Sequence, residues 1–183
     1  MSMPPMLAYT ITSSLNSGYM PQIVIGQGTN KAYLKPDSPA DDSYWFCILD
    51  ANNPKNKVKE FVVSGSNNAT VPNGLDAYMS NPAYIIAVVT QYLSTLHVPQ
   101  GAFYNYLVQH GAGRELQRLE QLNTSLGCGS IGRMSYILTT QGGNSFGYEH
   151  GDTVHAAQVL KSLMPGPTGQ PPYSICDSYT FNT

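Results

Sequence analysis

The chain has 183 residues, of which 42% are hydrophobic and only 11% are charged, whereas an ordinary globular domain carries about 25% charged residues. Its 13 Tyr, 5 Phe and 1 Trp exclude a disordered chain, because disordered segments lack aromatic residues and are rich in charge. The net charge of −2 and the scattered nine Lys and Arg exclude a nucleic-acid-binding surface, which needs many contacts to phosphates.

Residues 1–43 predict a β-rich lead segment. Short runs of β-branched and aromatic residues at Leu7 to Ile11 and at Ile23 to Ile25 are separated by turn residues at 16–18. Residues 36–42 are rich in Pro and Asp and predict a loop.

The next residues predict buried strands. Tyr44 to Leu49 is a continuous apolar run, and turn residues at 52–54 lead from it into a second strand at Val58 to Val63. Ala83 to Thr90 gives the strongest strand pattern in the chain. Because it is apolar at both odd and even positions, both of its faces are predicted to be covered.

Three segments in the middle of the chain predict helices. The first is a short helix that Asn73 or Thr70 caps. The second covers Pro99 to Gln109, and the third covers Arg114 to Leu126, where Gly127 ends it. The predicted inward side chains are Leu75, Tyr78 and Met79 in the first helix, Phe103, Tyr106 and Leu107 in the second, and Leu116, Leu119, Leu122 and Leu126 in the third.

The last third of the chain predicts one more strand, one more helix and a tail. Met134 to Thr140 is apolar and closed by two glycines, which indicates a strand. Asp152 is a good N-cap for a helix over Thr153 to Leu163. The spacing of Val154, Ala157, Leu160 and Leu163 places these side chains on its inward face.

These elements predict a single domain of mixed α/β class. Its central, mostly buried sheet is flanked by helices, because buried strands alternate with helices along the chain. The core spans residues 44–143, after the lead of residues 1–43. A loop and the C-terminal helix follow at 144–164, and a Pro- and Tyr-rich tail at 165–183 is predicted to be extended.

The order of elements in residues 44–143 resembles the interleukin-like EMT inducer family, whose domain is also called the GG or FAM3-like domain. The resemblance rests on a buried strand that ends in Asp50, the apolar strand at 84–90, and the segment from Leu126-Gly127 through the strand to Gly142. It implies a β-sandwich-like or mixed α/β globule with lectin-like associations. Members of this family occur as secreted signalling proteins, as carbohydrate-binding modules and in phage tail proteins.

Location and redox state follow from composition. No run of about 18 apolar residues occurs, and Met1 to Met6 lack the features of a secretory signal, so we expect no membrane insertion. A surface rich in Tyr, Asn, Ser and Gly favours an extracellular or virion protein over a cytoplasmic one. Cys47 lies in an apolar run and is predicted to be buried, whereas a Cys128–Cys176 bridge would need an oxidising compartment.

Residues 149–155 are the most suggestive cluster for chemistry. His150, Asp152 and His155 are ligand types that zinc and other transition metals accept, so they are weak candidates for a metal site. A helix cap at Asp152 explains the same residues without a metal. His97 and His110 are further candidates for a catalytic pair, and Cys128 lies in a Gly-rich loop that resembles a nucleophile turn.

For binding, tyrosines in or near loops and helix ends matter more, because sugar rings stack on aromatic faces while amides and carboxylates bind hydroxyl groups. The candidate ligand-binding residues are Tyr104, Tyr148, Glu149 and Tyr173.

We therefore expect a non-enzymatic recognition or structural module without a cofactor. It binds carbohydrate or a cell surface as part of a phage tail or another extracellular assembly. The expected partners are a glycan, a surface receptor or neighbouring subunits, including copies of the same chain, and not nucleic acid. The alternatives are a small metal-dependent hydrolase that uses His150, Asp152 and His155, and a secreted toxin or effector.

Overall fold

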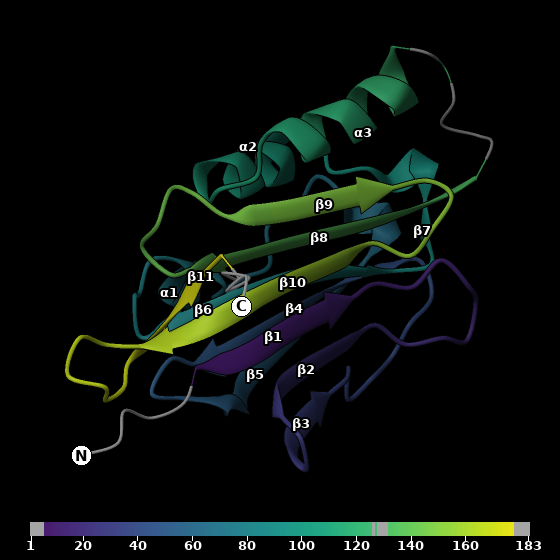
Figure 1. Ribbon diagram of the computed structural model, residues 1–183. Coiled ribbons are helices and arrows are strands. Elements are labelled where there is room, and N and C mark those ends of the chain that lie inside the picture. Colours follow the sequence, from purple (N-terminus) through teal and green to yellow (C-terminus); the bar gives the residue numbers. More distant parts are fainter. Residues whose placement is uncertain (1–5, 126, 128–131, 178–183) are drawn as a thin grey trace.

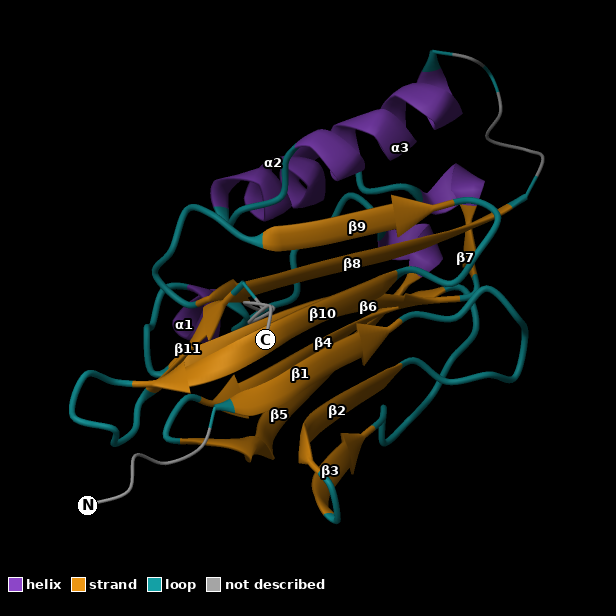
Figure 2. Cartoon of the chain, viewed as in Figure 1, coloured by secondary structure: helices purple, strands orange, loops and turns teal. Residues whose placement is uncertain are grey.

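The computed structural model describes residues 6–125, 127 and 132–177, and within them strands account for 44% of residues and helices for 18%. The strands form two antiparallel sheets that pack face to face, with helices on one side only (Figures 1 and 2). The predicted α/β fold, with helices flanking a central sheet, is therefore wrong. The chain folds as a mostly β structure.

The first sheet combines both ends of the chain. Its strands lie in the order β11 (Tyr173–Cys176), β10 (Gln158–Pro165), β1 (Leu7–Thr12), β2 (Gln22–Gln27) and β3 (Asn30–Leu34). In the register of β1 with β10, Leu7 lies opposite Leu163 and Thr12 opposite Gln158. The predicted lead and tail segments thus belong to one sheet, in which β10 joins them, and the described part of the tail contributes the strand β11.

The second sheet contains the predicted buried strands. Its order is β5 (Asn53–Ser64), β4 (Ser43–Asp50), β6 (Tyr84–Gln91), β8 (Arg133–Gln141) and β7 (Leu93–Ser94), and β9 (Tyr148–Asp152) pairs with β8. The strands β4, β6 and β8 were predicted with nearly these bounds, whereas β5 begins at Asn53, five residues before the predicted start at Val58.

Both faces of the central strands β4 and β6 are buried, as their apolar pattern predicts. Side chains alternate along β4, so that Trp45 and Cys47 point into the core between the sheets. Tyr44 and Phe46 point the other way, into a core beneath the helices. The prediction that Cys47 is buried is confirmed, and burial raises the pKa of its thiol, so it stays protonated.

Helices α2 (Gly101–Gln109) and α3 (Arg114–Thr124) cover the outer face of the second sheet (Figure 1). Phe103 and Leu107 of α2 and Leu116 and Leu119 of α3 are buried against it. The short helix α1 (Asp76–Met79) follows Leu75 without a side-chain cap, so the predicted cap at Asn73 or Thr70 is wrong. Two short 3-10 helices, η1 (Gly65–Asn67) and η2 (Thr95–His97), complete the described elements.

The predicted helix over Thr153 to Leu163 is wrong. Asp152 caps a turn instead, where its Oδ1 accepts hydrogen bonds from the backbone N–H groups of Val154 (2.7 Å) and His155 (3.1 Å). The chain then enters β10, which pairs with β1 and β11 on its two sides. The apolar spacing of this segment also fits a helix, but backbone hydrogen bonds to two neighbouring strands favour the strand.

Substitutions in β10 separate a strand from a helix at this position. Val159 is 6% exposed and Leu160 is 59% exposed, whereas a helix would bury Leu160 and expose Val159. We expect Val159→Ala to lower the free energy of unfolding by about 1.5 kcal/mol, since two buried methyl groups are lost. Leu160→Ala should change it by less than about 0.5 kcal/mol. Urea denaturation of both variants checks this, and the reverse order would contradict the strand.

Two further sequence predictions concern the membrane and the cysteines. In the part of the chain that the structure describes, no helix has the length and apolar character needed to cross a membrane. Cys128 of the proposed Cys128–Cys176 bridge lies outside the described residues. The Cys176 thiol donates to the backbone oxygen of Ser162 at 3.4 Å.

Candidate functional site

A groove of about 480 Å³ runs between α2 and α3. Its lining combines one aromatic ring with amide, carboxylate and hydroxyl groups, from Pro99, Gln100, Gly101, Tyr104, Gln117, Glu120 and Thr124. A smaller hollow of about 250 Å³, with the apolar side chains of Leu119, Leu122 and Met134, lies at the C-terminal end of α3. A third hollow also joins aromatic side chains, those of Phe146 and Tyr148, to polar ones, but its volume of about 10 Å³ holds no more than a water molecule.

In each of the two helices, side chains buried in the core fix the position of the residues that line the groove. Phe103, next to Tyr104 in sequence, is buried in the core beneath the helices, which fixes the first turn of α2. On α3, Gln117, Glu120 and Thr124 are three and four residues apart, so they share one face of the helix. Leu116 and Leu119 anchor the adjacent face in the core. The polar residues of α3 are thereby presented beside Tyr104.

Several polar groups of the groove are available to a ligand. Among the described residues, the side chains of Gln100, Tyr104 and Gln117 form no hydrogen bond and no ion pair within the chain. Glu120 accepts a hydrogen bond from Thr124 Oγ1 at 2.8 Å. Partial burial, together with the carboxylates of Glu120 and Glu149, raises the pKa of Tyr104, so its hydroxyl stays a hydrogen-bond donor.

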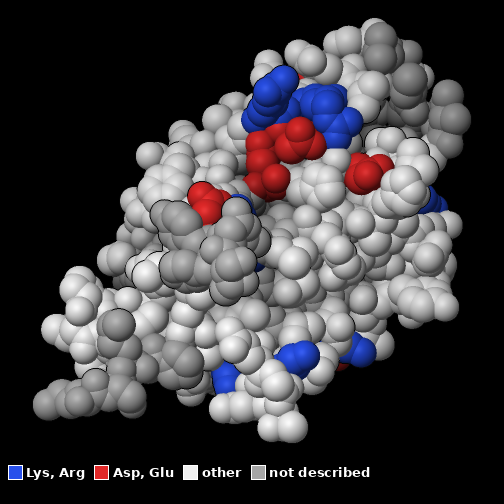
Figure 3. All heavy atoms as spheres, in the orientation of Figure 1, with Lys and Arg blue, Asp and Glu red and all other residues white. Residues whose placement is uncertain are grey.

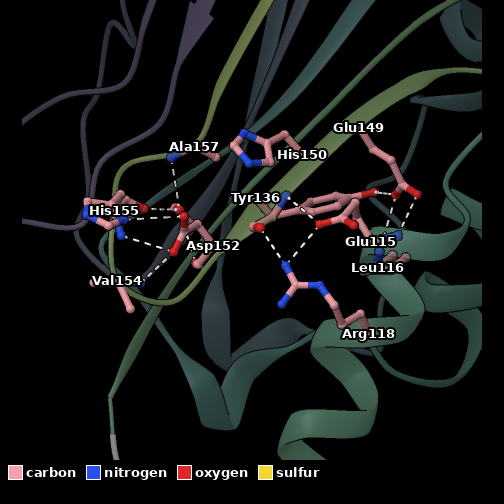
Figure 4. Close-up of polar contacts among 12 residues, drawn as sticks. Glu115, Leu116, Arg118, Tyr136, Glu149, His150, Asp152, Val154, His155 and Ala157 are labelled. Carbon is pink, nitrogen blue, oxygen red and sulfur yellow. Dashed lines mark hydrogen bonds and ion pairs between the residues drawn. The ribbon is translucent and has the colours of Figure 1, made fainter.

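Glu149, a predicted ligand-binding residue, lies on β9 and anchors the start of α3 (Figure 4). Its Oε1 accepts hydrogen bonds from the backbone N–H groups of Gly113 (3.0 Å) and Glu115 (2.8 Å), and its Oε2 accepts one from that of Leu116 (3.3 Å). The buried Tyr136 hydroxyl donates to Oε2 at 2.8 Å. The carboxylate satisfies backbone donors that a helix start leaves unpaired.

The remaining predicted binding tyrosines lie away from the groove. Tyr148 is half-buried on β9, and the ammonium of Lys161 sits 4.0 Å from the centre of its ring. Tyr173 is 9% exposed and packs into the core between the sheets. Of the four candidate ligand-binding residues, the structure places only Tyr104 in the groove.

Of the candidate metal ligands, His150 lies within β9, Asp152 ends that strand, and His155 lies in the turn that follows (Figure 4). Asp152 Oδ2 lies 3.6 Å from Nδ1 of His155, whose side chain is 79% exposed. His150 Nδ1 instead contacts the backbone nitrogen and oxygen of Gln158 at 3.2 and 3.0 Å. Within the described ranges, no three His, Cys, Asp or Glu residues are grouped so that they could hold a metal ion.

The other two histidines have separate partners. His97 Nδ1 lies 2.8 Å from Asp42 Oδ2, and Asp42 Oδ1 accepts a hydrogen bond from the backbone N–H of Ser94. A Cβ added at Gly65 would lie 2.8 Å from His97 Nδ1, so this contact needs a glycine. The ring centre of His110 lies 4.6 Å from that of Tyr106, and burial lowers the pKa of His110. The Asp42–His97 pair connects the segment before β4 to η2.

Charged side chains are unevenly distributed. On the face shown in Figure 3, acidic and basic groups gather over the region of α3 and β9, and most of the remaining surface is uncharged. Arg118 belongs to this region, because its guanidinium donates to Glu115 (2.9 Å) and to the backbone oxygen of Gly151 (2.6 Å).

Comparison with known proteins gives no family. No model of a protein family matches the chain, and neither does any curated protein. The resemblance of residues 44–143 to the interleukin-like EMT inducer family stays a prediction.

Proposed function

We propose that this protein is a non-enzymatic recognition module that binds carbohydrate in the groove between α2 and α3. The observation that carries the proposal is the Tyr104 ring beside amides with no partner among the described residues. A sugar ring presents an apolar face of C–H groups and an edge of hydroxyl groups. The first stacks on an aromatic ring, and the second exchange hydrogen bonds with amides and carboxylates.

The dimensions and surroundings of the groove support this proposal. A volume of about 480 Å³ lies within the range of small-molecule sites, and the open groove suits a segment of a longer glycan. A chain with only 11% charged residues and many Asn, Ser, Gly and Tyr residues suits contact with an extracellular or virion surface. We place the protein there, bound to a surface glycan or beside neighbouring subunits.

Tyr104→Ala tests the proposal. We expect it to weaken binding to a neutral oligosaccharide at least tenfold, because stacking on an aromatic ring contributes on the order of 1–1.5 kcal/mol beyond the area that it buries. Tyr104→Phe keeps the ring and should lose no more than about threefold. A printed array of manno-, galacto-, gluco- and N-acetylglucosamine oligosaccharides identifies the ligand, and calorimetry measures both variants.

The matched control is Tyr33→Ala on β3, a tyrosine that is 61% exposed on the other sheet. It should leave binding unchanged, and all three variants should unfold at nearly the same urea concentration. No binding by the wild-type protein to any glycan on the array would overturn the proposal. Equal losses from Tyr33→Ala and Tyr104→Ala would place the site elsewhere.

A further inference from the structure

We infer that the groove between α2 and α3 selects glycans by charge, so that it prefers amino sugars, accepts neutral sugars and excludes sulfated or carboxylated ones. This inference rests on the proposed function. It concerns which class of sugar binds at the same site.

The lining of the groove carries one carboxylate, that of Glu120, and no Lys or Arg. Among the described residues Glu120 forms no ion pair, so its charge is not neutralised by a neighbouring cation. Its Oε1 accepts a hydrogen bond from Thr124, which leaves Oε2 as an acceptor for a ligand.

Helix α3 carries two basic residues, Arg114 and Arg118, and neither of them lines the groove. Arg118 donates to Glu115 of its own helix and to Gly151 on β9, which holds its guanidinium over the strand. The second carboxylate that acts on Tyr104 is Glu149, and its hydrogen-bond partners are backbone N–H groups and the Tyr136 hydroxyl. The lining of the groove is therefore negative, and it offers no Lys or Arg to a ligand anion.

An amino sugar has partners for its charge in the same place. Its ammonium group can pair with Glu120 while its ring lies against Tyr104, whose negative π face also attracts cations. A neutral sugar keeps the stacking and the amide contacts but gains no ion pair. An N-sulfated sugar keeps them too and is repelled by Glu120.

The test uses three forms of one oligosaccharide that differ only in the substituent on the amine nitrogen of each sugar. They are β-linked glucosamine oligomers with free amines, with N-acetyl groups and with N-sulfo groups. The same three forms of galactosamine oligomers provide a second sugar series. At about pH 6 and low salt, we expect the free amine to bind more tightly than the N-acetyl form. The N-sulfo form should bind about tenfold more weakly than the N-acetyl form. Raising the salt concentration should reduce both differences.

Glu120→Gln assigns the selectivity to one residue, because it removes the charge and keeps the shape. In this variant the N-acetyl and N-sulfo forms should differ by less than about threefold. The control Asp177→Asn removes one negative charge next to Lys161, away from the groove, and should leave the tenfold difference unchanged. N-sulfo binding as tight as N-acetyl binding in the wild-type protein overturns this inference alone. Absence of binding by all forms and by all neutral glycans of the array overturns the proposed function as well.

Discussion

Gly111→Ala is expected to lower the free energy of unfolding by about 4 kcal/mol. Gly111 lies between α2 and α3 with φ at +102°, a conformation that an L-residue rarely adopts. A Cβ at this position would lie 2.3 Å from the backbone nitrogen of Gly147 and the carbonyl carbon of Phe146. Backbone strain and overpacking each cost about 1–3 kcal/mol, and neither contact can be relieved by rotating a side chain.

The contact also matters for the groove, because it holds the connection between the two helices against residues 146–147. Urea denaturation followed by circular dichroism measures the effect. Gly132→Ala is the matched control, since a Cβ there has no neighbour within 4 Å among the residues that the structure describes, and its φ lies outside the left-handed region. We expect it to change stability by less than about 0.5 kcal/mol. A Gly111→Ala variant as stable as this control would mean that residues 146–147 do not pack on the helix connection.

The central strands were predictable because their apolar runs leave no other interpretation. Tyr44 to Leu49 and Ala83 to Thr90 are apolar at both odd and even positions, and the structure buries both of their faces. The helix predicted over residues 153–163 was wrong for the opposite reason, because their pattern allows two interpretations. Their apolar spacing of three residues fits a helix, while Val159 and Leu163 also share one face of a strand. Pairing with β1, far away in the sequence, decides between the two.

The predicted fold class was wrong because it depends on the pairing of strands that lie far apart in the sequence. Leu7 faces Leu163 across the first sheet, and no pattern within either segment reveals such a partner. The lead and the tail were therefore treated as additions to a core and residues 153–163 as a helix, when these three segments together supply a complete sheet. Once that sheet is present, it covers the inner face of β4 and β6, and helices are needed only on the outer face.

The candidate site was predictable in part. Tyr104 follows from its position near the start of a helix, whereas Gln117 and Glu120 were missed, because they matter only through the placement of α3 beside α2. The leucine stripe of α3 was a usable signal, since the polar residues flanking it must face outward. The contacts of Glu149 with the start of α3 were missed, because the backbone N–H groups that donate to it lie 33 to 36 residues earlier in the chain.

Glu149→Ala is expected to lower the free energy of unfolding by about 3 kcal/mol. The substitution removes the acceptor of three backbone N–H groups at the start of α3, where a lost cap alone costs about 0.5–2 kcal/mol. It also leaves the hydroxyl of the fully buried Tyr136 without its carboxylate partner, which adds about 1–3 kcal/mol. Relative to the wild-type protein, amide hydrogen exchange should become faster in α3 than in β4 and β6, because the substitution removes hydrogen bonds of α3 directly.

Two variants separate anchoring from a simple loss of charge. Glu149→Gln keeps an oxygen acceptor and the shape of the side chain, so it should cost about half as much as Glu149→Ala. Glu120→Ala removes a carboxylate from the groove-lining face of α3 and should change the free energy of unfolding by less than about 0.5 kcal/mol. If Glu149→Ala proved as stable as Glu120→Ala but lost glycan binding, Glu149 would belong to the ligand site and not to the support of α3. The expected order of stability, with Glu149→Ala lowest, instead makes this glutamate the residue that holds one wall of the groove in place.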